Sequence, residues 1–498
     1  MVTLDDVADK SLLQKPSPEA PESLERSESK YQPLATFALP KERNYHQQFA
    51  DVYFIRLAKI KPIVEEIAHA AWEGTVVGGE TATKVDRVLD VRQGQLCWVV
   101  GTVYMEMPLK PSVLEDISHD RWIAAPTTAD KYYSPDGGDK IMLEDDSGRL
   151  TLVGSILKDY FLVTGCIIAV MGTENAHGEF EVLDLKFADL PPQPDRWRLS
   201  QAPKAKEEDV EMSDVSSGSR SKKIAIVSGL EFSGTDTSHA MELNLLLEFL
   251  LGEALGPAAQ SELSQISRLI IAGNSIAKPS DTDAAGDKKP HSKKYGYDAS
   301  SYNPLPAQLF DGFLAEILPT MPVTLLPGAL DPANVSYPQQ PIHPAMFPRA
   351  RAYVSPPSTS SPSEPGWFDN VTNPWEGELE GWRVLGTGGQ NLDDICRYID
   401  NDDRLGMMEA MCRWRCSAPT APDTLWSYPF QDDEPFTMKE CPHLYFVGCQ
   451  PEFGTKVIEG PQGQMVRLIL VPSFAATKEV VLVDTETLDV SRVKITTS

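Results

Sequence analysis

The sequence predicts a chain of two main parts, a small all-β barrel followed by a larger α/β domain. Three observations lead to this fold class. Apolar residues recur with a helical period over 44–72, with a period of two over 83–189, and as short runs separated by helical stretches after 223. The length of 498 residues fits about two to four domains. We therefore expect a helical segment, a β domain and an α/β domain, in that order.

Composition and charge limit the classes of function. Hydrophobic residues make up 41% of the chain and charged residues 23%, which is enough apolar material for a large core. Lys and Arg number 45 against 72 Asp and Glu, so the formal net charge is −27. Proteins that bind duplex DNA or anionic membranes need a basic face. Contact with DNA is therefore expected to be weak or indirect, and membrane binding is disfavoured.

Cysteine usage and the N-terminus indicate the compartment. The seven cysteines are odd in number and scattered, unlike the framework of a secreted disulfide-rich protein. No run approaches the ~20 apolar residues of a membrane span, and Met1–Lys10 is too polar and acidic for a signal peptide. These features favour a soluble protein with reduced thiols, in the cytosol or nucleus.

The first 82 residues predict a tail and a helical segment. Residues 1–43 are rich in Pro, Ser and Glu without a sustained apolar period, which predicts a disordered tail. Over 44–82 we expect a helical segment that packs on the core, with Asn44 as a candidate cap and the helical stripe ending at Trp72. Pro62 interrupts the hydrogen-bond ladder, so two shorter helices or one kinked helix are expected.

Residues 83–199 predict a small β-barrel. Five strand-like runs lie between Gly- and Asp-rich turns, and they occupy residues 96–104, 140–144, 150–157, 166–171 and 179–187. Five strands without a strong internal helix favour a closed barrel, for which the OB-fold is the commonest five-stranded form. A β-sandwich is the alternative.

A charged, Ser-rich linker at 200–222 precedes the α/β domain of 223–498, in which 278–303 is expected to be a disordered loop and 327–380 irregular. Buried strands are expected at 223–228, 268–273, 322–326, 382–385, 444–447, 466–471 and 480–483. Helices are expected at 238–251, with Ser238 as the cap, and at 306–318, 392–399 and 407–416. The alternation predicts a mostly parallel sheet.

Small-residue turns follow the buried strands of this domain. Ligands of open α/β sheets bind at the carboxyl ends of the strands, so we expect the turns to converge on one edge. The turns are Ser228-Gly229, Gly273-Asn274, Gly328-Ala329, Gly386-Thr387-Gly388-Gly389 and Gly448-Cys449.

This arrangement resembles the calcineurin-like metallophosphoesterases, whose strands end in Asp-x-His, Gly-Asp, Gly-Asn-His-Asp/Glu and Gly-His-x-His motifs that hold two metal ions. A two-metal site needs several carboxylate and imidazole ligands, and only Asp331 keeps a charged ligand type here. The resemblance therefore implies an inactivated phosphoesterase domain with no catalytic residues, metal or cofactor. The degenerate positions are Ser228, Leu230, Asn274, Ala329, Leu330, Cys449 and Pro451.

An OB-type barrel before such a domain resembles the B subunits of replicative DNA polymerases, and especially the accessory B subunits of the delta type. The resemblance covers about residues 45–490. The chain departs from the family pattern in the tail, in the linkers and in an insert at 355–366. It is carried by VVGTVYMEMPLKPSVL (99–114), LVTGCIIAVMG (162–172), PGALDPANVSYPQQPIHPAMFP (327–348), LGTGGQNLDDICRY (385–398) and CPHLYFVGCQPEFGTK (441–456).

The resemblance implies a non-catalytic nuclear scaffold in DNA replication and repair synthesis. One partner would be the catalytic subunit of DNA polymerase delta, bound through that subunit's C-terminal zinc- and iron–sulfur-binding domain. The other would be an elongated third subunit that binds the sliding clamp. The alternatives are an active metal-dependent phosphoesterase, the B subunit of another replicative polymerase, and a single-strand-binding module, which the acidic charge opposes.

One segment is a candidate partner surface. Val335–Pro348 is interrupted by prolines and lies near the expected sheet edge. Rigid loops with aromatic side chains suit protein interfaces, and the alternative is that the segment simply covers the sheet. The residues that we select are Tyr337, Ile342, His343, Met346 and Phe347.

Three further motifs have ordinary structural explanations. Cys412, Cys416, Cys441 and His443 match zinc-site spacing only loosely, so buried thiols and a packed histidine are expected. In Arg413-Trp414-Arg415 we expect a buried or interfacial tryptophan between two arginines that pair with acids. The adjacent Asp393 and Asp394 diverge on a helix, which predicts solvated carboxylates rather than an acid–base pair.

Overall fold

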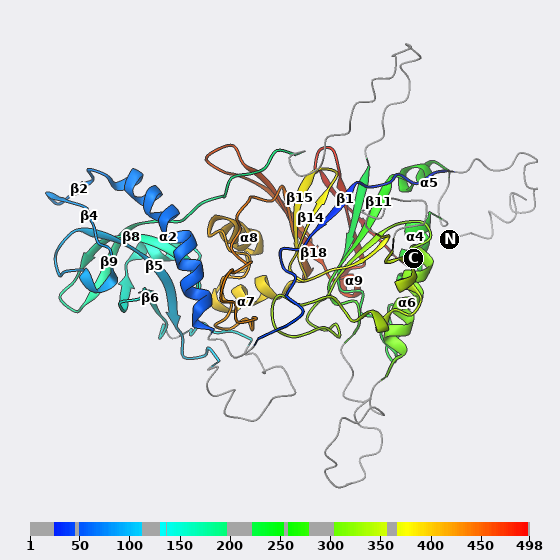
Figure 1. Ribbon diagram of the computed structural model, residues 1–498, viewed down its shortest axis with the longest axis horizontal. Coiled ribbons are helices and arrows are strands. Elements are labelled where there is room, and N and C mark those ends of the chain that lie inside the picture. The colour runs from blue at the N-terminus through cyan, green and yellow to red at the C-terminus, as the bar shows by residue number, and fades with distance from the viewer. Residues whose placement is uncertain are drawn as a thin grey trace, which may run out of the picture.

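The computed structural model describes residues 24–44, 49–111, 130–135, 137–196, 222–252, 257–277, 303–355 and 366–496. Nearly all of the expected linker, the expected disordered loop and the Pro/Ser-rich insert lie outside the described residues. The molecule is elongated, with a barrel at one end and two stacked sheets with outer helices at the other (Figure 1). No described helix is long and apolar enough to cross a membrane.

A closed barrel forms the first end. Its strands are β5 (Cys97–Glu106), β6 (Lys140–Glu144), β7 (Arg149–Val153), β8 (Ile167–Glu174) and β9 (Glu179–Lys186). They pair in the order β5-β6-β7-β9-β8, and β8 pairs again with β5, which closes the barrel. Short β4 (Thr83–Lys84) runs parallel to β5. The predicted barrel is confirmed, and the β-sandwich alternative is wrong.

The helix α2 (Ala50–Trp72) packs on the outer surface of the barrel. Its buried residues repeat at steps of four and include Ile60, Val64 and Ala68, which contact the outward side chains of β5 and β8. The helix continues through Pro62, so two separate helices are not formed. Pro62 faces solvent, where water can hydrate the carbonyl that the proline leaves unpaired.

The helix starts later than the sequence suggested. Phe49 is the N-cap, whereas the backbone N–H of Asn44 donates to the hydroxyl of Tyr428. A small hairpin of β2 (Val76–Val77) and β3 (Glu80–Thr81) follows the helix.

Two six-stranded sheets stack face to face in the second part. The first has the order β13 (Phe368–Asn370), β12 (Val323–Leu326), β11 (Ile266–Ala272), β10 (Lys223–Val227), β19 (Glu479–Asp484) and β20 (Val490–Lys494). The second has the order β1 (Tyr31–Leu34), β14 (Trp375–Leu379), β15 (Trp382–Thr387), β16 (Leu444–Gln450), β18 (Met465–Pro472) and β17 (Gly454–Glu459).

The expected single, mostly parallel sheet is wrong. Each sheet has a parallel block, β13-β12-β11-β10 in one and β15-β16-β18 in the other, and its remaining strands are antiparallel. The faces that meet are apolar and form one core between the sheets, with residues such as Ile226, Ile270, Phe446, Val471 and Val481.

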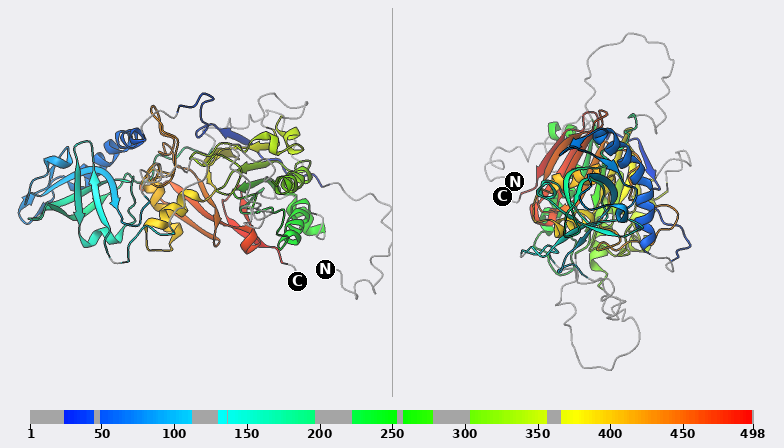
Figure 2. Two further views of the ribbon diagram at one scale, coloured as in Figure 1. Left: turned by 90° about the horizontal axis from the view of Figure 1, so that it is seen from below. Right: turned by 90° about the vertical axis from the view of Figure 1, so that its left-hand side faces the viewer.

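Helices cover the outer faces of both sheets (Figure 2). On the first sheet lie α4 (Ala240–Leu251), α5 (Pro257–Leu263) and α6 (Leu305–Ile317), while α9 (Phe474–Thr477) follows β18. On the second lie α7 (Gln390–Tyr398) and α8 (Arg404–Arg413), which also face the barrel. One apolar cluster continues from the barrel interior through these two helices to the second sheet, so the two ends are packed together.

Several strands lie where the sequence has no periodic signal. β1 falls within the expected disordered tail, and β13 and β14 fall within the expected irregular stretch. These strands are three to five residues long and contain Pro, Asp or Gly. They form because a neighbouring strand supplies hydrogen-bond partners, which is a tertiary effect rather than a local preference. The cap of α4 also differs, because His239 rather than Ser238 is the N-cap residue.

Candidate functional site

The turns after the buried strands meet at one edge between the two sheets. The N–H of Gly229, after β10, donates to the carbonyl of Gly273, after β11, at 2.9 Å. The amide oxygen of Asn274 accepts the N–H of Leu330 at 3.0 Å. The N–H of Cys449 donates to the hydroxyl of Ser228 at 2.8 Å. Four of the five turns predicted to converge are therefore hydrogen-bonded to one another.

Glycines allow these turns to touch backbone to backbone. A Cβ on Gly273 would lie 3.1 Å from the Cα atoms of both Gly328 and Gly388. A Cβ on Gly328 would lie 2.2 Å from the nitrogen of Asn274, and one on Gly448 would lie 2.1 Å from the oxygen of Ala272. These distances are shorter than van der Waals contact. The edge is thus closed by main chain.

Side chains at the degenerate positions bond to this backbone. The buried Ser228 hydroxyl lies 3.1 Å from the carbonyl oxygens of Val471 and Pro472. The Cys449 sulfur is 3.7 Å from the carbonyl oxygen of Ala272, and burial raises the pKa of its thiol well above the ordinary value. Leu230 is wholly buried in the apolar core of the first sheet. These three residues hold the closed edge together.

The remaining degenerate positions offer little to a ligand. Ala329 and Pro451 are exposed and Leu330 is half-buried. Their side chains contain only carbon, so they cannot hold a metal ion. Among the described residues, no group of three or more His, Cys, Asp or Glu is arranged to hold one.

Asp331 is the carboxylate that this edge retains, and it serves as an internal acceptor. Its Oδ1 accepts the N–H of Ile276 at 2.9 Å, and its Oδ2 accepts the N–H of Gly328 at 2.7 Å. Burial raises the pKa of the carboxyl to about 6, although these N–H donors act to lower it. Asp331 thereby joins the turn after β12 to the turn after β11.

The titration of Asp331 leads to a predicted pH dependence of stability. Because its pKa is about 6 in the folded chain and about 3.9 in an unfolded chain, the folded state binds the proton more tightly. Protonated Asp331 therefore contributes to the free energy of unfolding. This contribution is fully present below about pH 4 and is lost as the pH rises through about 6, a loss on the order of 2–3 kcal/mol. Urea unfolding across this range should show the loss in the wild type and not in Asp331→Asn. If the free energy of unfolding changed with pH in the same way for both proteins, this role of Asp331 would be contradicted.

A neutral amide network lies beside the closed edge and was missed by sequence reasoning. Asn373 donates from Nδ2 to Gln339 at 3.0 Å and to Gln390 at 2.9 Å, and its Oδ1 accepts from the hydroxyl of Tyr337 at 3.0 Å. Gln390 also donates to Gln339 at 2.8 Å. In the sequence, the unusual Tyr-Pro-Gln-Gln-Pro run was a signal that could have pointed to this network. Amides satisfied in this way position the chain and carry no proton or metal chemistry.

The selected partner-surface residues separate into two groups. Tyr337, Ile342 and Phe347 are at most 1% exposed, so they cannot present their side chains to a partner. Phe347 packs on Phe310 of α6, with ring centroids 6.0 Å apart. His343 is exposed and Met346 is half-buried. Ile342 and Phe347 belong to the apolar core of the first sheet, and Tyr337 belongs to the cluster that joins the second sheet to the barrel. An interface role for the segment stays a prediction.

The cysteine and aspartate motifs are part of the core. Cys412, Cys416 and Cys441 are buried free thiols, and burial raises the pKa of each. The expectation of two solvated carboxylates is wrong for Asp394, which is 1% exposed and accepts the hydroxyl of Thr424 at 2.6 Å. Burial raises the pKa of its carboxyl.

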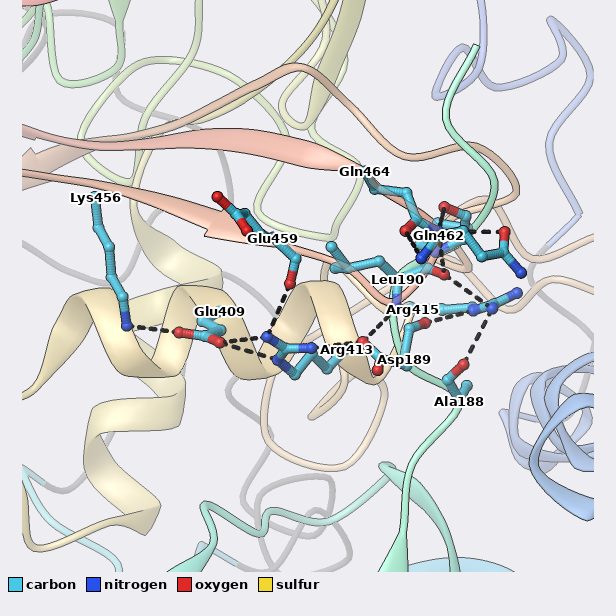
Figure 3. Close-up of polar contacts among 11 residues, drawn as sticks. Ala188, Asp189, Leu190, Glu409, Arg413, Arg415, Lys456, Glu459, Gln462 and Gln464 are labelled. Atoms are coloured by element: carbon cyan, nitrogen blue, oxygen red, sulfur yellow. Dashed lines mark hydrogen bonds and ion pairs between the residues drawn. The ribbon is translucent and has the colours of Figure 1, made fainter. Parts of the chain in front are cut away.

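Two arginines fasten α8 to the segment that leaves the barrel (Figure 3). Arg413 pairs with Asp189 at 2.6 Å and with Glu409 at 2.7 Å, as predicted. Arg415 instead donates to backbone carbonyls, because no acid lies within ion-pair distance in the described chain. Trp414 between them is 1% exposed and belongs to the core. The carbonyls that Arg415 contacts are those of Ala188, Asp189 and Leu190.

Comparisons with known proteins agree with both parts of the fold. A family described as "DNA polymerase delta subunit OB-fold domain" matches residues 48–185, which supports the predicted OB-fold. The family of the B subunits of DNA polymerases alpha and epsilon matches residues 224–455.

Relatives match nearly the whole chain. The "DNA polymerase delta small subunit" of Saccharomyces cerevisiae is 34% identical over 485 residues, 91% of each chain. Proteins of the same description from Arabidopsis thaliana and Oryza sativa subsp. japonica are 33% and 32% identical. These alignments cover 93% and 95% of this chain, and 95% and 99% of the relatives.

Proposed function

The chain belongs to the DNA polymerase delta small-subunit family, and from this premise we propose that it acts as a non-catalytic scaffold. Membership makes it an accessory subunit of DNA polymerase delta, with a role in DNA replication. We further propose that it works in the nucleus, where this polymerase acts.

The closed strand-end edge is the observation that supports a non-catalytic role. A two-metal phosphoesterase site needs carboxylates and imidazoles around ions about 3.5–4 Å apart. Here Ser228, Asn274 and Asp331 bond to the surrounding backbone, and glycine backbones occupy the centre of the edge. We propose that the two-sheet part is a calcineurin-like domain whose metal ligands were replaced by structural contacts.

A metal-addition experiment tests this inactivity. Neither Mn²⁺ nor Zn²⁺ is expected to induce hydrolysis of bis(p-nitrophenyl) phosphate, because no set of ligands in the described chain faces the edge. The melting temperature should also stay unchanged, since only ligands of the folded state stabilise it. Manganese-dependent hydrolysis that Asp331→Ala abolishes would contradict the proposal and favour an active phosphoesterase.

We propose two partners for the scaffold. One is the catalytic subunit of DNA polymerase delta, held through its C-terminal zinc- and iron–sulfur-binding domain, and the other is an elongated third subunit that binds the sliding clamp. The continuous apolar cluster between barrel and sheets supports this, because a stiff, elongated body can hold two proteins at a fixed separation. Tethering the polymerase near the clamp raises its effective concentration there.

Purification of the tagged chain from its native cells tests the partner proposal. Mass spectrometry of stoichiometric partners should identify a large DNA polymerase and a clamp-binding protein. Recovery of the chain alone, or with a different replicative polymerase, would contradict this assignment.

A further inference from the structure

One stretch of this acidic chain, which includes the buried strand β12 and the partly exposed helix α6, contains very few charges. Only five of the 53 residues from 303 to 355 are charged, against 23% of the whole chain. Asp311 and Asp331 are buried at 2% and 6% exposure, so Glu316 is the one acid that this stretch exposes. The other two charged residues are Arg349 and Arg351. Acidic residues and lysines are depleted at protein–protein interfaces, whereas arginine and methionine are enriched.

This stretch forms a surface on the outer side of the first sheet. The helix α6 packs against the 3-10 helices η6 (Pro344–Met346) and η7 (Ala350–Tyr353). Although α6 buries one face in the core, it exposes Leu305 and Leu309 to solvent at 41% and 44%. These two leucines are one helical turn apart and so lie on one face. Val354, just after η7, is 50% exposed.

The two arginines lie beside these apolar side chains. Gly312 is on the same face of α6 as Leu309, three residues later. A Cβ on Gly312 would lie 3.9 Å from Nη1 of Arg349, so the guanidinium lies close to the helix at this glycine. Both Arg349 and Arg351 are exposed. Within the described chain, no acid forms an ion pair with these two guanidiniums.

We propose that this surface binds an acidic, aliphatic segment of another subunit of the polymerase. The α6–Arg349 surface, as we name it, consists of Leu305, Leu309, Met346, Arg349, Arg351 and Val354. The proposal rests on the proposed function, because it takes the partner to be a polymerase subunit.

Charge complementarity selects this partner chemistry. Carboxylates of the segment would pair with the two guanidiniums, and aliphatic side chains would cover the two leucines and Val354. The net charge of −27 repels an acidic segment from most of the chain, so attraction at this patch would also determine where the segment binds. The surface lies at the end of the molecule away from the barrel, so a partner bound there leaves the barrel accessible (Figure 1).

Hydroxyl-radical footprinting of the assembled complex tests the surface directly. The full chain is compared alone and in a complex with the catalytic and third subunits. Oxidation of Leu305, Leu309 and Met346 should fall about fivefold or more on assembly, because the centre of an interface excludes water. Met241, which is 63% exposed on the neighbouring α4, is the internal control and should keep its oxidation rate.

The possible outcomes separate this proposal from the proposed function. If the complex assembles and the three side chains are oxidised as in the free chain, the surface is not an interface and the proposal is overturned. If no complex assembles, the proposed function fails, and this proposal fails with it.

A charge-reversal variant tests the role of the arginines. Arg349→Glu with Arg351→Glu should weaken binding of the partner about tenfold at low salt, and the effect should shrink as added salt screens the charges. Arg92→Glu is the matched control, because Arg92 is also exposed and forms no ion pair within the described chain. Unchanged affinity and an unchanged footprint in the double variant would overturn the proposal, provided that its melting temperature matches the control.

Discussion

Replacing Arg56 with alanine is expected to lower the free energy of unfolding by about 3–5 kcal/mol, because the change leaves a buried carboxylate without its partner. Arg56 is 1% exposed and pairs at 2.8 Å with Glu434, which is wholly buried. Its guanidinium also donates to the carbonyls of Pro419 at 2.7 Å and Ala421 at 3.0 Å. Arg56 lies on α2 at the barrel, whereas all these partners belong to the second part of the chain. The variant should therefore loosen the junction between the two ends.

The same junction provides a matched control. Lys59 lies one turn after Arg56 and pairs with Asp433, which directly precedes Glu434, but both of these side chains are partly exposed. Lys59→Ala should cost less than about 1 kcal/mol, as exposed ion pairs do. Urea unfolding followed by circular dichroism measures both variants. Equal losses for Arg56→Ala and Lys59→Ala would contradict the importance of the buried pair.

A double replacement distinguishes the charge from the packing. Arg56→Met combined with Glu434→Leu removes both charges and leaves apolar side chains of similar length. Such replacements of buried ion pairs are often nearly neutral, so the double variant should recover most of the stability lost in Arg56→Ala. A loss as large as that of the single variant would indicate that the hydrogen bonds to the carbonyls matter more.

The second large effect is expected at the closed edge between the sheets. Gly448→Ala would place a Cβ 2.1 Å from the carbonyl oxygen of Ala272 and 3.0 Å from its Cβ. The ends of β16 and β11 would have to move apart, and overpacking of this kind costs about 1–3 kcal/mol. The melting temperature, measured by differential scanning calorimetry, should fall accordingly.

A glycine outside the edge serves as the control for this prediction. The nearest atom to a Cβ on Gly138 would be Cγ of Pro108 at 3.6 Å, which is an ordinary contact. Gly138→Ala should therefore change stability by less than about 0.5 kcal/mol. If Gly448→Ala were tolerated equally well, the edge would be open rather than closed, and an accessible site there would have to be reconsidered.

Local periodicity predicted the parts of the fold that are regular and buried. β7 and β9 alternate between buried and more exposed residues, and β10 and β11 are mostly apolar and almost wholly buried, so their positions could be read from the sequence. The convergence of the turns also followed, because strand ends of one sheet share an edge. In contrast, β1 depends on the exposed edge of β14, its partner more than 300 residues away, and no local pattern reports such a pairing.

The residues that hold the molecule together were harder to predict. An arginine such as Arg56 in an amphipathic helix is usually solvated, and its partner Glu434 is 378 residues away in sequence. Asp394 was expected to be a solvated carboxylate beside Asp393, but its side chain on α7 is buried and accepts a hydrogen bond from Thr424. The lost metal ligands were visible in the sequence, whereas the closure of the edge by glycine backbones required the three-dimensional structure.

The scaffold claim is tested most directly by native mass spectrometry of the reconstituted polymerase. The catalytic subunit and the clamp-binding third subunit are mixed with and without this chain, and the masses of the complexes are recorded. We expect one complex of all three proteins when the chain is present, and separate catalytic and third subunits when it is left out. A stable complex of those two subunits in the absence of this chain would contradict its role as the scaffold.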